Sequence, residues 1–93
     1  MIDPEAYPHL AIFFRGYLHE DFLAEHGSAR KALAAFRADL SPADRPALDA
    51  ERRRLALALQ QLTLVEIRRL IREDFRSAWN PATHSAVMAL LRD

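Results

Sequence analysis

The segment from Tyr7 to Gly27, YPHLAIFFRGYLHEDFLAEHG, decides the fold of this 93-residue chain, because an apolar helical stripe is followed there by a polar cluster. Pro8 suits the first turn of a helix, where its missing N–H costs nothing. Large apolar side chains then recur at helical spacing, at Leu10, Phe13, Phe14, Tyr17 and Leu18. The pattern predicts a helix that buries this face, with Ile12 widening it. Gly16 costs about 1 kcal/mol of helix propensity relative to Ala, so it could mark a place where another backbone comes close.

The polar cluster from His19 to Gly27 predicts an ordered loop, with Phe22 and Leu23 as its anchors in the core. Gly27 can take a positive φ at the end of the loop, and Ser28 can cap the next helix. Two interpretations of the loop remain open. His19, Asp21 and His26 could hold a metal, although their spacing matches no known metal-ligand motif.

The second interpretation of the loop is structural or partner-contacting, and it is the one we favour. His19 and Asp21 would then bond the loop backbone and cap helix ends, since buried polar groups need partners. Replacing either residue with Ala would cost about 1–3 kcal/mol if it leaves a buried partner unsatisfied.

Length and composition predict one small domain spanning residues 1–93, with a single core. The chain has no cysteine, which fits a reducing compartment. Its first residues, MIDPEAYPHL, lack the pattern of a signal peptide. No apolar stretch reaches the length that spans a bilayer. We therefore expect a cytoplasmic protein with no membrane partner.

Charge is balanced over the whole chain but not along it. The net charge of zero argues against a nucleic-acid partner. Residues 1–27 contain five acidic residues against Arg15 alone, a net charge of −4, and residues 28–93 carry the balancing +4. An acidic segment suits an electropositive partner, because complementary potentials speed association. The alternative is that these acids lie near helix N-termini, where the dipole favours them.

Four further helices are predicted, over residues 28–40, from 41 or 46 to 62, over 63–75, and from 83 to the C-terminal end. The third of the five starts either with a bent turn at Pro42, capped by Ser41, or anew at Pro46. Thr63 and Glu66 have the spacing of a capping box. The expected fold class is all-α, a single compact bundle of about five short helices.

Three features outside the first segment could serve either packing or binding. Arg52, Arg53 and Arg54 form a basic run without interleaved aromatics, and the stem of Arg52 can cover the core edge while its head reaches water. Leu57 lies off the apolar stripe of its helix. Trp79 either plugs the core edge beneath a loop or acts as a partner-binding anchor.

Nothing in the sequence predicts an enzyme. The serines and histidines occur in no nucleophile or metal motif, and two glycines cannot make a phosphate-binding loop. We expect no catalytic, metal or cofactor site. A metal-dependent or hydrolytic enzyme using His19, Asp21 and His26 is the least favoured hypothesis.

The first 40 residues resemble the small helical immunity proteins of contact-dependent growth inhibition systems. The resemblance rests on the order YP-x-L-x-x-F-F-x-G-Y-x-H-x-D-F from Tyr7 to Phe22, followed by G-S and an A-L-x-x-F helix ending at Phe36. The family's usual loop reads H-Q-D-W, so Glu20 stands for Gln and Phe22 for Trp. His26 stands where Tyr is common. The match is loose after residue 40.

The resemblance implies a cytoplasmic protein that binds a cognate toxin domain stoichiometrically and blocks its activity. Many such toxins are basic nucleases, which the acidic first segment would fit. The candidate motif or partner-binding residues are His19, Glu20, Asp21, Phe22, Glu25, His26 and Trp79. The alternative is a small helical interaction module or a homodimer, favoured by Leu57 and Trp79.

Overall fold

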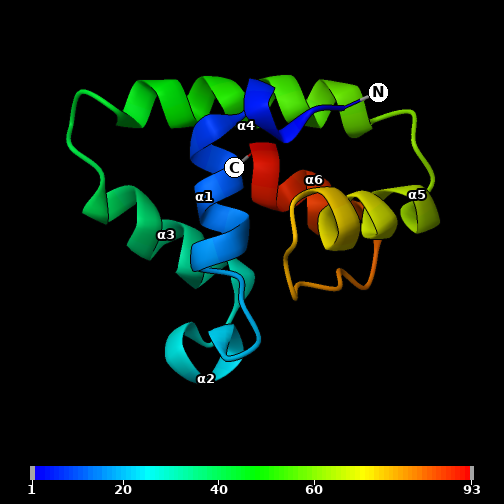
Figure 1. Ribbon diagram of the computed structural model, residues 1–93, viewed down its shortest axis with the longest axis horizontal. Helices are drawn as coiled ribbons and strands as arrows, with labels where there is room; N and C mark the ends of the chain where they lie inside the picture. The colour runs from blue at the N-terminus through cyan, green and yellow to red at the C-terminus, as the bar shows by residue number, and fades with distance from the viewer. Residues whose placement is uncertain (1, 93) are drawn as a thin grey trace.

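Residues 2–92 are described by the computed structural model, and all regular structure within them is helical (Figure 1). The elements are η1 (Pro4–Ala6), α1 (Pro8–Gly16), α2 (Phe22–His26), α3 (Ala29–Asp39), α4 (Arg45–Leu59), α5 (Leu64–Arg69), the π-helical turn η2 (Leu70–Asp74) and α6 (His84–Arg92). The predicted all-α bundle of about five helices is confirmed. A sixth, α2, is a single short turn inside the predicted loop.

The longest helix, α4, lies across one end of α1, and α2 lies at the opposite end (Figure 1). α6 packs against α4 and α3, and α2 packs against α3. The radius of gyration, 12.1 Å, is close to the roughly 12 Å expected for a folded domain of this length. No helix within residues 2–92 is long and apolar enough to cross a membrane.

The predicted stripe of α1 forms the centre of the core. Leu10, Phe13, Phe14 and Leu18 are at most 1% exposed. Phe13 stacks on Phe36 of α3 at 5.5 Å between ring centroids, and Phe14 lies 4.9 Å from Phe75. The α1 stripe therefore joins the helices on both of its sides.

Two predictions about α1 are wrong. Ile12 is 59% exposed, because it lies about 200° around the helix from Leu10 and faces away from the core. No neighbouring backbone approaches Gly16, since a Cβ built there would have nothing within 4 Å. Gly16 is instead the last residue of the helix.

The predicted helix starts are confirmed where the signal is local. Ser28 accepts a hydrogen bond from the Lys31 N–H and caps α3. Thr63 and Glu66 make both bonds of the capping box. The third predicted helix restarts near Pro46, since α4 begins at Arg45. The Ser41 cap belonged to the alternative start at Pro42, which does not occur, and the Ser41 hydroxyl donates to the Asp44 carboxylate.

The start of α1 is held by a carboxylate from α4. Glu51, only 3% exposed, accepts hydrogen bonds from the backbone N–H groups of His9 and Leu10 at 2.9 and 3.1 Å. Its second oxygen lies 2.5 Å from Nδ1 of His9. Pro8 has no N–H to satisfy, so one side chain meets the needs of the first turn.

The run of three arginines is largely explained by contacts within the fold. The predicted solvation of the Arg52 head is wrong, because its guanidinium donates to Asp49 and to the carbonyl of Leu90 in α6. Arg54 donates to the carbonyl of Ala6, and its guanidinium lies 5.0 Å from the centroid of the Tyr7 ring. Only Arg53 in this run points to solvent without such a contact in residues 2–92.

Replacing Glu51 with Ala should lower the free energy of unfolding by about 3 kcal/mol, because two N–H groups at the start of α1 lose a charged acceptor. Glu51→Gln keeps one acceptor oxygen and should lose less. The measurement is urea denaturation followed by circular dichroism. Arg53→Ala, an exposed change on the same helix, should stay within about 0.5 kcal/mol of wild type. A Glu51→Ala variant as stable as the Arg53 control would contradict this account of α1.

Acid should weaken the fold through Asp49. The hydrogen bonds from Arg37 hold the pKa of Asp49 below its ordinary value; burial opposes them and Arg52 assists them. Because the folded pKa is the lower one, this stabilisation is complete above the unfolded pKa and is lost as pH falls through the folded value. Asp49→Asn should therefore be less stable at pH 7 and lose less stability below about pH 4.

The check is the urea midpoint measured from neutral to acidic pH. Asp74→Asn, an exposed change at the end of η2, should follow the wild-type curve. Parallel curves for Asp49→Asn and wild type would contradict the role of Asp49.

Candidate functional site

Residues 19–27, here called the α2 lobe, project beyond the end of α1 (Figure 1). Phe22 anchors the lobe as predicted, being 7% exposed. Leu23 does not, since it is 62% exposed. Successive helical residues point about 100° apart, so a single turn that buries Phe22 directs Leu23 outward. Gly27 ends the turn with φ at +86°, as predicted.

Both histidines of the lobe lie near the carboxylate of Glu25. Nε2 of His19 is 3.2 Å from Oε2 of Glu25, and Nε2 of His26 is 3.8 Å from the same oxygen. The His26 ring also stacks on Tyr17, with 5.9 Å between centroids. These contacts tie the lobe to the end of α1.

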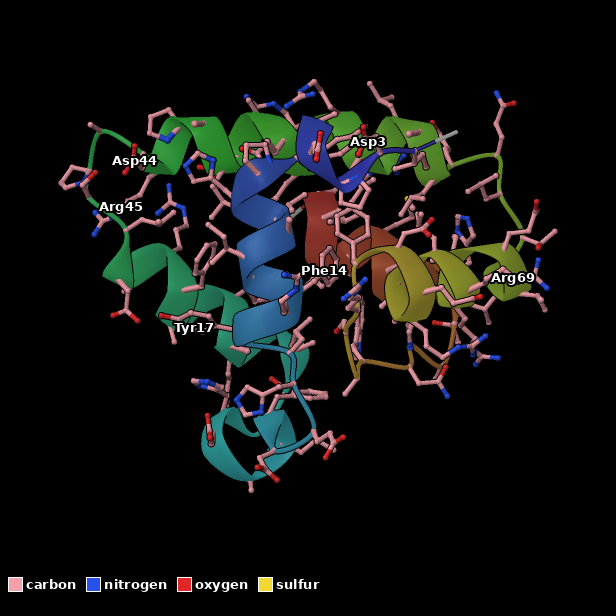
Figure 2. The ribbon with its side chains drawn as sticks, viewed as in Figure 1. Asp3, Phe14, Tyr17, Asp44, Arg45 and Arg69 are labelled. Atoms are coloured by element: carbon pink, nitrogen blue, oxygen red, sulfur yellow. The ribbon has the colours of Figure 1, made fainter. Side chains whose placement is uncertain are left out.

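Tyr17 links the same end of α1 to α3 (Figure 2). Its hydroxyl donates to Asp39 at 2.5 Å, and this hydrogen bond raises the pKa of Tyr17 above its ordinary value. Its ring meets Phe36 edge-on at 4.9 Å. Tyr17 thus connects the lobe, through His26, to Phe36 and Asp39 of α3.

His19 and Asp21 were predicted to act alike, but the structure gives them different contacts. His19 orders the turn, because its Nδ1 accepts a hydrogen bond from the Asp21 N–H at 3.1 Å. The Asp21 side chain is exposed and does not cap α2, so the expected cap is wrong. Within residues 2–92 no three histidine, cysteine, aspartate or glutamate side chains are placed to hold a metal ion together.

Residues 75–83 connect η2 to α6, and this connector is hydrogen-bonded to Leu18, just after the end of α1. The Ser77 hydroxyl and the Ala78 N–H both donate to the Leu18 carbonyl, at 2.8 and 2.9 Å. Ser77 is 6% exposed. Sequence reasoning missed this residue, because a lone serine in a connector belongs to no pattern.

Trp79 packs at the edge of the core, 6.4 Å from Phe14 between ring centroids and nearly parallel to it. The backbone N–H of Trp79 donates to the Ser77 hydroxyl. The side chain is only partly buried. This placement agrees with a core plug beneath a loop, and its outer edge remains open to solvent.

A hollow separates the lobe from the connector. Its lining residues are His19, Glu20, Asp21, Arg72, Arg76, Ser77 and Ala78. A second hollow shares Arg72, Ser77 and Ala78 and extends to Trp79. The structure thus brings four candidate residues to neighbouring surfaces: His19, Glu20, Asp21 and Trp79. His26 instead lies beside Tyr17, and Phe22 is buried in the core.

The acidic first segment does not form one surface. Asp3 and Glu5 belong to the η1 region beside α4, whereas Glu20, Asp21 and Glu25 lie in the lobe (Figure 2). Helix α1, nine residues long, separates the two groups by about 13 Å. The acidic charge that a partner meets at the lobe is therefore local.

Arg76, at the rim of the hollow, has φ at +54°, the left-handed region that favours glycine. This conformation ends the helix, because the Ser77 N–H folds back to the carbonyl of Ile71 at 3.0 Å. The Arg76 side chain is exposed and makes no hydrogen bond or ion pair within residues 2–92. The backbone here would suit glycine better.

Comparisons with known proteins give a consistent picture. A family model described as "CdiI immunity protein" matches residues 6–89. The chain is also similar to one in the "Crystal structure of CdiA-CT/CdiI complex from Y. kristensenii 33638". That similarity has 26% sequence identity and a TM-score of 0.67, and it covers all of both chains. No curated protein matches the chain.

Replacing Arg76 with Gly should leave the free energy of unfolding unchanged or raise it by up to about 1.5 kcal/mol. Relief of the left-handed strain is worth about 1–2 kcal/mol, against about 0.5–1 kcal/mol for the added freedom of the unfolded chain. The matched control is Arg72→Gly, which places the same residue inside η2 and should lose about 1 kcal/mol. Urea denaturation of both variants distinguishes them. Equal losses would show that the Arg76 side chain stabilises the fold.

Proposed function

This chain belongs to the CdiI immunity protein family, and we propose that it neutralises a cognate contact-dependent growth inhibition toxin by binding the toxin domain. The observation that carries the proposal is the family match over residues 6–89. Its similarity along the whole chain to a protein from a CdiA-CT/CdiI complex supports it. The protein acts by occupying the toxin stoichiometrically, and it performs no chemistry of its own.

The toxin-contacting surface that we propose is the α2 lobe with the adjoining hollow. Leu23 is an exposed apolar side chain flanked along the chain by the exposed acids Glu20, Asp21 and Glu25. An apolar anchor within a polar rim is the usual anatomy of a specific interface. The acids give the lobe a negative potential, which suits an electropositive toxin. Phe22 and His26 support this surface from within the fold.

We place the protein in the cytoplasm. The chain has no cysteine, as suits a reducing compartment. The proposal requires that the protein meet the toxin after the toxin enters the cell.

A homodimer or other helical interaction module is the second candidate. Leu57 and Val65 are 68% and 69% exposed, and Val65 lines a groove formed by residues at the end of α4, in α5 and in η2. Trp79 does not join that surface, since it packs on Phe14. Light scattering that finds only monomer at high protein concentration would remove the homodimer.

The proposal is tested by co-purification with the C-terminal domain of the large secreted protein encoded next to this chain. We expect a stable one-to-one complex and restored growth when both are expressed in the same cell. The absence of both a complex and growth rescue would contradict the proposed function.

Reversing charge on the lobe should slow that association. Glu20→Lys and Glu25→Lys should each reduce the association rate constant by about tenfold at low salt, because they remove electrostatic steering. The effect should shrink as salt is added. Glu5→Lys, the same change beyond the other end of α1, is the control and should associate at the wild-type rate. Stopped-flow fluorescence measures the association rate constant of all three variants. Equal rate constants for the lobe variants and for Glu5→Lys would exclude the lobe as the steering surface.

A further inference from the structure

The hollow between the α2 lobe and the connector presents charges of both signs. Glu20 and Asp21 line it from the lobe, and Arg72 and Arg76 line it from η2 and the connector. We infer that this hollow receives a segment of the toxin that carries a carboxylate beside a basic side chain. The arginines bind the carboxylate, and the acids bind the base. The inference rests on the proposed function and names the chemistry of the toxin surface.

The four charged side chains do not neutralise one another. No ion pair joins either acid to either arginine in the part of the chain that the structure describes. The ion pair of Arg72 is with Glu73 on its own helix, at 3.7 Å between Nη2 and Oε2. These side chains are 69% and 56% exposed, and so exposed a pair holds the guanidinium only weakly. The hollow therefore keeps donors and acceptors for a partner.

Arg76 stands where the backbone favours glycine, with φ at +54°. The turn needs this conformation so that Ser77 and Ala78 reach the Leu18 carbonyl. It does not need the guanidinium, which has no partner within residues 2–92. Residues held in such sparsely populated backbone conformations cluster at active sites and ligand-binding sites. A ligand contact accounts for an arginine at this position.

The walls of the hollow are fixed before any partner arrives. The connector side is held by two hydrogen bonds to the Leu18 carbonyl, at 2.8 and 2.9 Å. On the lobe side, His19 accepts the Asp21 N–H. Walls that are already ordered reduce the entropy lost on binding. The backbone that carries all four charges thus has a defined arrangement in the free protein.

A surface of mixed sign selects its partner more strictly than an acidic lobe would. Any basic protein could approach Glu20 and Asp21. A partner that is basic throughout, however, would place like charge against Arg72 and Arg76, and uncompensated like charges disfavour a complex. The hollow thus accepts a toxin whose carboxylate lies opposite the arginines and whose basic side chain lies opposite the acids.

The test uses the purified toxin domain encoded beside the chain, with affinity measured by titration calorimetry. Arg76→Gly and Arg72→Gln should each weaken binding at least tenfold. Arg76→Glu should weaken it more than Arg76→Gly, because the toxin carboxylate then meets a like charge. Arg53→Gln, on the exposed side of α4, is the control and should bind as wild type does. Thermal melting of each variant verifies that it is folded.

The outcomes separate this inference from the proposed function. Wild-type affinity in the Arg72 and Arg76 variants overturns the inference while the toxin complex itself stands. Binding by Arg76→Glu that equals or exceeds that of Arg76→Gly overturns the carboxylate partner. A wild-type chain that neither binds the toxin domain nor rescues growth overturns the proposed function and this inference together.

Discussion

The bond between the Glu51 carboxylate and the first turn of α1 sets the geometry on which the rest of the structure depends. A helix start leaves N–H groups without partners in its own helix, and burying them unsatisfied is costly. Here the acceptor comes from α4, 41 and 42 residues away in sequence. The two helices can meet this requirement only where α4 crosses the end of α1. Because α4 crosses one end of α1, the other end of α1 and the lobe beyond it point away from α4.

The far end of α1 is fixed in a complementary way. There the Leu18 carbonyl, two residues beyond the end of α1, accepts hydrogen bonds from the Ser77 hydroxyl and the Ala78 N–H of the connector. The central helix is therefore tied at both ends by polar contacts with distant parts of the chain, and its aromatic stripe fills the space between. This arrangement matters for binding, because a surface on two anchored segments loses little freedom when a partner arrives. An immunity protein that acts by occupancy needs that property more than any reactive group.

Whether a feature could be predicted from the sequence depended on how far apart in the chain the interacting residues lie. The Ser28 cap, the Gly27 turn and the Thr63–Glu66 box were predictable, because each is made within four residues. Leu23 was misassigned because apolar character does not say which way a one-turn helix faces. Within the candidate site, the resemblance located the lobe residues, but no local pattern marked the arginines across the hollow. Arg72 lines the hollow from η2, and Arg76 lines it from a turn whose left-handed residue is not glycine.

The sequence by itself determined the helical class, nearly all helix positions and the family, because helical periodicity, capping signals and the Tyr7–Phe36 motif are local in the chain. Only the tertiary structure decided which polar groups are buried and which charges share a surface. Glu51 and Ser77 look like any exposed glutamate or loop serine until distant backbone groups are placed against them. The acidic first segment is likewise continuous in sequence and divided in space, because a rigid helix stands between its halves. The sum of charges could be counted from the residues, whereas their juxtaposition depended on the fold.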